Sequence, residues 1–238
     1  MRLLHDKAFR MAVGVVLLSC AAPALADEPV QKSALNMVWD VALSPPYVFF
    51  LLIACSIFTA TLIIERWTFY RKATGNTEDL LQQVKRAGSP TDALGFISAA
   101  PGVAAKVMRA TLQAAKDGCP ADQLENVAQS ASTKELIRME QYLPQLDSMV
   151  TLCPLLGLLG TTVGMIKSFS IVAAIGMSDP TKLAGGISEA LINTAAGLAV
   201  AIPALFAYNY FNGKKEAILM DLERGLTDLL LILKAPHH

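Results

Sequence analysis

The side chains that could do chemistry in this chain are hydroxyls and amides set within long apolar stretches. Thr161 and Thr162 stand near the middle of one stretch, and Asn193 and Thr194 stand in the next. Polar groups at membrane depth usually face a cavity or a partner, because burying them without a hydrogen bond is costly. A hydroxyl donates or accepts hydrogen bonds but does not titrate at physiological pH. If protons cross at Thr161 and Thr194, a carboxylate from another polypeptide must therefore sit between them.

Two ionisable residues, Glu189 and Lys167, lie nearer the ends of the same stretches. At about 1.5 Å per residue, Glu189 is only about 3 Å into its stretch, whereas Thr194 is about 10 Å in. At about 100° per residue, Glu189 projects about 140° away from Thr194. Glu189 therefore lines one lumen with Thr194 only if the helix is distorted or the lumen is broad; otherwise it faces a neighbouring helix or subunit. We interpret Lys167 as extending its amine to the outer headgroups.

Three apolar stretches approach the roughly 20 residues that cross a bilayer as a helix. They are residues 46–64, 148–174 and 187–211. Hydrophobic residues make up 53% of the chain and charged residues 17%, with a mean hydropathy of +0.44, which is far from the profile of a soluble domain. Lysine plus arginine (20) equal aspartate plus glutamate (20), so the net charge does not predict nucleic-acid binding. The expected fold is an all-α integral membrane protein.

Basic residues predict the orientation of these helices, because they concentrate on the cytoplasmic side. The first stretch is followed by Arg66, Arg71 and Lys72, and the third by Lys214, Lys215 and Arg224. The segments on the other side of the membrane hold one lysine each, Lys32 before the first stretch and Lys182 before the third. We therefore expect the N-terminus outside and the C-terminus in the cytoplasm. Residues 27–45 and 175–186 are then periplasmic, and residues 65–147 and 212–238 are cytoplasmic.

The first 26 residues have the features of a cleaved signal peptide. A basic stretch precedes an apolar run, and Ala24-Leu25-Ala26 forms a small-residue cleavage site. Asp27 would then be the first mature residue. An alternative is a lipoprotein-type site that leaves Cys20 lipidated.

The polar segments on the cytoplasmic side carry helical patterns. Residues 77–87 have acidic residues in the first turn, basic residues in the last and Gly88 as a stop, which suits the helix dipole. A longer pattern from Pro120 predicts that the second span continues as a helix below the membrane, with a bend at Pro144. After the third span, an apolar stripe at three- and four-residue spacing predicts a helix that packs on the chain's own cytoplasmic helices: Ile218, Leu222, Leu226, Leu229 and Leu233.

Small residues in the second and third spans predict close helix packing. Helices in lipid associate through small residues that let backbones approach, rather than through the hydrophobic effect. The second span contains Gly157, Gly160 and Gly164, and the third contains Gly197 among several alanines. Pro154 and Pro203 each remove a backbone hydrogen bond and permit a bend.

Cysteine and histidine positions predict neither a metal site nor an enzyme. The four cysteines show no disulfide or zinc spacing. A sequence such as "GISEAL" superficially resembles a serine-enzyme site, but the three histidines, His5, His237 and His238, all lie outside the spans. We expect no catalytic residue and no cofactor.

Two segments carry a family resemblance. "PLLGLLGTTVGMIKSF" (154–169) and "GGISEALINTAAGLAVAIPALFAYNYF" (185–211) closely resemble the two signature spans of the MotA/TolQ/ExbB proton-channel family. The three-span layout with a signal peptide is more similar to the ExbB branch than to the flagellar stator branch. This resemblance implies a homo-oligomeric, five-fold ring in the bacterial inner membrane, surrounding the single helices of a small ExbD/TolR-type partner that carries one membrane aspartate.

By position, the resemblance implies proton-path roles for Thr161, Thr194 and Glu189. The two threonines would hydrogen-bond the partner's aspartate in its protonated and ionised states, and Glu189 would lie near the outer entrance. A TonB-like protein would pass the work to outer-membrane receptors for iron-siderophores, vitamin B12 or similar cargo. A TolQ-like role in envelope maintenance and a membrane scaffold without transport are the alternatives.

Overall fold

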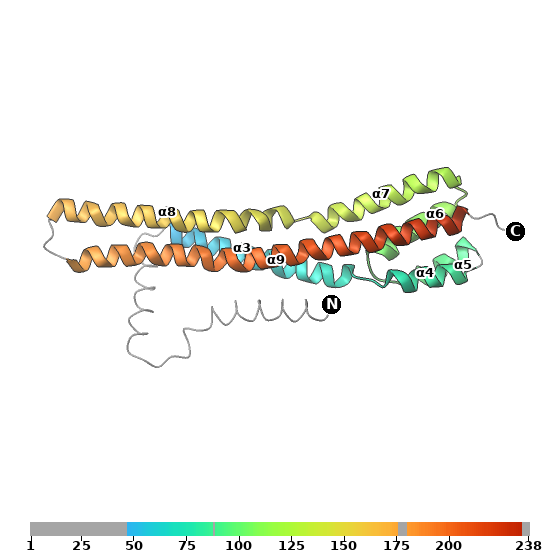
Figure 1. Cartoon of the computed structure of the whole chain (residues 1–238), viewed down its shortest axis with the longest axis horizontal. Helices are drawn as coiled ribbons and strands as arrows, with labels where there is room; N and C mark the ends of the chain where they lie inside the picture. Colours follow the sequence, from blue (N-terminus) through green and yellow to red (C-terminus); the bar gives the residue numbers. More distant parts are fainter. Residues whose placement is uncertain (1–46, 88, 176–179, 235–238) are drawn as a thin grey trace, which may run out of the picture. The chain divides into compact units, whose positions relative to one another are not determined.

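The computed structural model describes residues 47–87, 89–175 and 180–234, and every regular element in them is an α-helix. The helices are α3 (Tyr47–Ala73), α4 (Thr77–Arg86), α5 (Pro90–Ile97), α6 (Val103–Lys116), α7 (Ala121–Glu140), α8 (Leu143–Ile175) and α9 (Pro180–Lys234) (Figure 1). The predicted signal peptide (1–26) and periplasmic segment (27–45) lie outside the described residues. The prediction of an all-helical chain is confirmed for the part described.

Three helical segments are long and apolar enough to cross a membrane. They fall within Val48–Arg86, Asp122–Ser170 and Leu183–Leu233, and their most apolar 18-residue windows have mean hydropathies of 2.4, 1.8 and 1.9. Only 17%, 22% and 33% of these windows is buried within the chain, so most of their apolar surface must be covered by lipid or by other proteins. The expectation of three candidate spans is confirmed.

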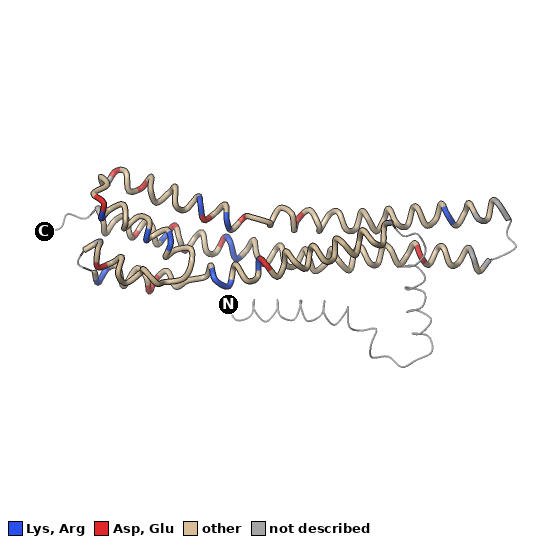
Figure 2. The backbone as a smooth tube through the Cα atoms, turned by 180° about the vertical axis from the view of Figure 1, so that it is seen from behind, with Lys and Arg blue, Asp and Glu red and all other residues tan. Residues whose placement is uncertain are grey.

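The chain divides into two compact units, and α3 and α9 contribute to both. The first unit contains described residues 47–63, 144–175 and 180–210. In this unit α8 and α9 run side by side (Figure 1) and are antiparallel, since Gly157 lies opposite Thr194 and Gly164 opposite Ala190. Acidic and basic residues are sparse along this unit and dense over the second (Figure 2).

The second unit contains residues 64–143 and 211–234 and has its own core of apolar side chains. Met108 and Leu112 of α6, Met139 of α7 and Leu222 and Leu229 of α9 are fully buried there. A Cβ atom added at Gly225 of α9 would meet side-chain atoms of Thr77 and Met108, so α9 packs directly on α4 and α6. The predicted docking of the C-terminal apolar stripe on the chain's own helices is confirmed.

The connection between α7 and α8 differs from the expected bend at Pro144. The helix ends at Glu140 and begins again at Leu143, and Tyr142 between them has φ 67°, which is rare for a residue with a side chain. Pro144 lies in the first turn of α8, where its missing N–H has no helical partner to lose. The interruption therefore precedes the proline, and the proline starts the new helix rather than kinking an old one.

Arg66 of α3 binds the end of α7 in the second unit. Its side chain is 1% exposed, and its Nη1 donates to the carbonyl of Arg138 at 3.0 Å. Its Nε and Nη2 donate to both carboxylate oxygens of Glu65, at 2.5 and 2.7 Å, and the guanidinium lies over the ring of Tyr142 at 5.1 Å. The last carbonyls of a helix lack intrahelical donors, and Arg66 supplies a donor to one of them. Its positive charge also interacts favourably with the negative end of the α7 helix dipole.

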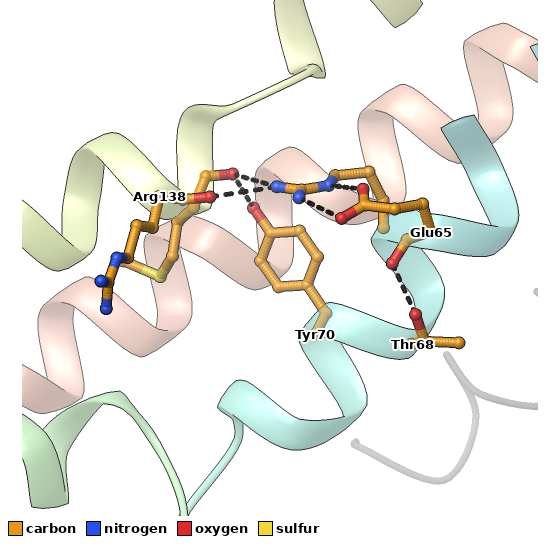
Figure 3. Close-up of polar contacts among 6 residues, drawn as sticks. Glu65, Thr68, Tyr70 and Arg138 are labelled. Atoms are coloured by element: carbon orange, nitrogen blue, oxygen red, sulfur yellow. Dashed lines mark hydrogen bonds and ion pairs between the residues drawn. The ribbon is translucent and has the colours of Figure 1, made fainter. Parts of the chain in front are cut away.

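Tyr70, one turn further along α3, makes a second contact to the same helix end (Figure 3). Its hydroxyl donates to the carbonyl of Met139 at 2.9 Å, and its ring stacks on Phe211 of α9 with centroids 5.4 Å apart. Burial raises the pKa of Tyr70 to about 12, although the positive charge of Arg66 lowers that pKa in part. Arg66 and Tyr70 thus hold the last carbonyls of α7 immediately before the interruption.

Candidate proton-conducting site

The candidate site is built on a narrow seam between α8 and α9, formed by the residues that face each other across the two helices. A Cβ added at Gly157 would lie 3.0 Å from the Cα of Thr194, one at Gly160 would lie 2.6 Å from the Cβ of Asn193, and one at Gly164 would lie 3.0 Å from the Cβ of Ala190. These distances leave no room for larger side chains. The glycines therefore set how closely the helices approach, and the antiparallel register follows from them.

Gly197 makes the tightest backbone approach in this seam. A Cβ there would lie 2.5 Å from the carbonyl oxygen of Cys153 and 3.1 Å from the Cα of Gly157. Both neighbours are backbone atoms, which cannot turn aside as a flexible side chain can. Of the four glycines predicted to serve helix packing, all are buried, and each lies against the facing helix.

Thr194 and Thr161 donate to neighbouring carbonyls of α8. The hydroxyl of Thr194 crosses the seam and donates to the carbonyl of Gly157 at 3.2 Å. The hydroxyl of Thr161 donates to the carbonyl of Leu158, the next one along the same helix, at 2.7 Å. Both side chains are half-buried. The two threonines singled out in the sequence thus address consecutive carbonyls, and both hydroxyls keep free acceptor capacity.

Thr162 differs from its neighbour in position. Its hydroxyl also bonds its own helix, at the carbonyl of Leu159, but its side chain is exposed, whereas that of Thr161 is half-buried. Such internal bonds are common for hydroxyl residues in apolar helices and lower the cost of placing them there. Thr162 is therefore a suitable control for the other two threonines.

Glu189 lies on the other flank of the seam from the threonines. On each helix the threonine follows a seam residue by one position (Gly160 or Asn193), whereas Glu189 precedes the seam residue Ala190 by one. One step along a helix is a turn of about 100°, so residues before and after a seam position project to opposite sides. Because α8 and α9 are antiparallel, Thr161 and Thr194 project to the same side. Glu189 is also about 7 Å from Thr194 along the axis of α9.

Lys167 is the neighbour of Glu189 that sequence reasoning missed. Its Nζ lies 3.7 Å from Oε2 of Glu189, with side-chain exposures of 48% for the lysine and 19% for the glutamate. The lysine was interpreted as extending toward headgroups, and its half-exposed stem permits this, but its amine also pairs with a carboxylate of the facing helix. The pairing of small residues across the two helices could have shown it, because Ser168 faces Gly186 and Ala190 faces Gly164. Lys167 and Glu189 each precede one of these facing residues by one position, so they project to the same side of the seam.

Asn193, one of the polar residues noted in the third span, received no role from sequence reasoning. It is 7% exposed, sits against Gly160, and its Oδ1 has no hydrogen-bond partner among the described atoms. A buried amide oxygen without a donor is costly, so the middle of the seam holds acceptor capacity that the described residues leave unused.

Among the described residues there is no group of three or more histidine, cysteine, aspartate or glutamate side chains that could hold a metal ion. Cys55, Cys119 and Cys153 are free thiols. The chemistry that the site offers is hydrogen bonding by neutral groups, with one ion pair beside it.

Comparison with known proteins shows the family. The sequence model of the MotA/TolQ/ExbB proton channel family matches residues 99–224, more than half of the 238 residues. A protein named biopolymer transport protein ExbB-like 3 from Synechocystis sp. is 30% identical over 192 residues, covering 75% of this chain and 88% of that protein. The biopolymer transport protein ExbB of Neisseria meningitidis is 29% identical over 195 residues, with 76% and 88% covered.

Other relatives are named TolQ. The Tol-Pal system protein TolQ of Pseudomonas aeruginosa is 38% identical over 99 residues, which is 40% of this chain and 43% of that protein. The chain thus matches less than half the length of this TolQ, whereas it matches 88% of the two ExbB-named relatives above and 42% of the ExbB of Xanthomonas campestris, which is 32% identical over 106 residues. The matched region includes the whole seam and both threonines. This chain belongs to the MotA/TolQ/ExbB proton channel family.

Proposed function

We propose that this chain is a subunit of an inner-membrane proton channel that converts the proton gradient into mechanical work. The observation that carries the proposal is the arrangement of Thr161 and Thr194, whose half-buried hydroxyls lie on one flank of the α8–α9 seam at the same turn of α8. Neither titrates, and no other described side chain between Ser148 and Tyr210 is acidic except Glu189. The titrating acid is therefore supplied by a partner.

The partner in this proposal is an ExbD-like single-span protein with one membrane aspartate. A hydroxyl can donate to a carboxylate and accept from a carboxylic acid, so the two threonines bind the aspartate in both charge states. A valine at either position could do neither. We assign Glu189, which lies closer to the end of the span and on the opposite flank of the seam, to the outer entrance of the path, where the lumen must be broad enough for both flanks to face it.

Several copies of the chain form a ring around this partner, which we take to be a pentamer. The apolar windows of the spans are largely uncovered within one copy, so neighbouring copies and lipid share that surface. The topology is N-terminus periplasmic and C-terminus cytoplasmic, because basic residues follow the first and third spans.

The work is passed to a TonB-like protein and energises outer-membrane import of iron-siderophores, vitamin B12 or similar cargo. The predicted signal peptide and periplasmic stretch, residues 1–45, favour this role over envelope maintenance. The TolQ-like role is the second candidate. A deletion strain distinguishes them: iron starvation is expected for the first and detergent sensitivity for the second.

The direct test measures proton flux in liposomes that contain the chain and its co-purified partner. We expect Thr161→Val and Thr194→Val to abolish flux, and Glu189→Ala to abolish energised uptake in cells, while each variant still assembles. Thr162→Val is the matched control and should conduct normally. A fully active double variant, Thr161→Val with Glu189→Ala, would instead indicate a scaffold without transport.

A further inference from the structure

The ion pair between Lys167 and Glu189 occupies an unusual place in the molecule. Of the side chains that the structure describes between Ser148 and Tyr210, these two alone are charged. A single charge at the centre of a membrane helix costs about 2.5–3.5 kcal/mol on insertion scales, and the cost falls when it is paired or near the interface. The pair joins α8 to α9 on the flank of the seam opposite the threonines.

The neighbouring layers of the seam fix the positions of both side chains. Lys167 directly precedes Ser168, which is buried against Gly186, and Glu189 directly precedes Ala190, which is buried against Gly164. Backbones held this closely leave the lysine and glutamate little freedom to separate except by side-chain rotation. The 3.7 Å separation between Nζ and Oε2 is an ion pair without a direct hydrogen bond, so attraction between the charges maintains it.

We propose that Lys167 is a positioning residue for Glu189. Its ammonium holds the Glu189 carboxylate directed across the seam, so that the outer entrance of the path has an acidic group in a fixed position. Lys167 does not itself carry protons. This inference rests on the proposed function, because it assigns Lys167 a part in the same proton path.

The pairing predicts a specific pattern among variants. Lys167→Met keeps the apolar stem but removes the charge, and should lower proton flux about fivefold, since partly exposed pairs are worth up to about 1 kcal/mol. Lys167→Arg keeps the charge and should conduct like the unaltered chain. Lys72→Met, at an exposed position of α3, is the control for loss of a lysine charge.

A double-mutant cycle separates positioning from a general effect on the fold. Detergent-purified complexes with Lys167→Met, Glu189→Gln and both changes are unfolded by denaturing detergent, and the midpoints are compared. If Lys167 acts through Glu189, the second change adds no loss to the first, and the coupling is about two- to fivefold in the unfolding constant. Additive losses, or normal flux in Lys167→Met, would overturn the inference.

Thr194→Val in the same flux assay distinguishes failure of the proposed function from failure of the role assigned to Lys167. Loss of flux in Thr194→Val with normal flux in Lys167→Met refutes the role of Lys167 alone. Normal flux in Thr194→Val refutes the proposed function, and with it the inference. Loss of flux in both, with recovery in Lys167→Arg, supports both.

Discussion

Replacing Gly197 by alanine tests the seam between α8 and α9 most directly. The added methyl group would lie 2.5 Å from the carbonyl oxygen of Cys153, whereas ordinary contact begins at 3.4 Å. Because the obstructing atom is backbone, the two helices must separate by about 0.9 Å at this layer or distort. Overpacking of this kind costs about 1–3 kcal/mol.

The same displacement reaches the candidate site. Gly157, whose carbonyl accepts the hydroxyl of Thr194 at 3.2 Å, is itself 3.1 Å from the position of the added methyl group. A separation of the helices by a further fraction of an ångström takes that donor and acceptor beyond hydrogen-bonding distance. Gly197→Ala should therefore lower both stability and proton flux, although Gly197 is not one of the proposed proton-path residues.

The assay is unfolding of the purified protein by denaturing detergent, with proton flux measured on the same preparation. Gly213→Ala is the matched control, because a Cβ there meets nothing within 4 Å and alanine favours helix over glycine by up to about 1 kcal/mol. Equal stability of Gly197→Ala and Gly213→Ala would show that Gly197 does not set the spacing of α8 and α9. A destabilised Gly197→Ala that conducts normally would show that the seam does not position Thr194.

Three further predictions concern other contacts. Arg66→Met should cost about 1–3 kcal/mol, because carbonyls at the end of α7 lose their donor, and should speed hydrogen exchange there, whereas Arg71→Met at an exposed site should not. Burial raises the pKa of Tyr70 from 10.0 to about 12, so the protonated phenol stabilises the fold fully below pH 10, and this stabilisation is lost as the pH rises toward 12. Denaturation curves should therefore show a decline of about 2–3 kcal/mol over this range, and Tyr70→Phe should lack it. Gly186→Ala forces the hydroxyl of Ser168 to turn away, so Ser168→Ala should restore the unfolding midpoint of Gly186→Ala.

The spans and several helix ends were predictable because each depends on local properties of the chain. Apolar runs of sufficient length indicated the three spans. The charges in α4, acidic at its start and basic at its end, together with Gly88, indicated the helix Thr77–Arg86. The spacing of small residues likewise indicated which face of α8 meets α9.

The remaining features depend on distant contacts, which periodicity does not contain. Arg66 was interpreted as an orientation signal at the end of a span, yet it is buried because the carbonyls of α7, 72 residues away in sequence, lie beside it. The interruption at Tyr142 was missed because a tyrosine gives no sign that its φ is positive. The pairing of Lys167 with Glu189 required the register between two helices.

The bonds of Thr161 and Ser168 to their own helix have a consequence for speed. Thr161 donates to the carbonyl of Leu158 at 2.7 Å and Ser168 to that of Gly164 at 2.9 Å, so neither hydroxyl needs a water molecule as its acceptor. Exchanging that acceptor for a visiting group is rotation about one Cα–Cβ bond, with the backbone unmoved. For side chains that are not fully enclosed such rotations take picoseconds to nanoseconds, whereas helices shift past one another in microseconds or longer. Under the proposed function, the half-buried hydroxyl of Thr161 therefore changes its partner faster than the helices can move, whereas Ser168, which is 1% exposed, stays with its own helix.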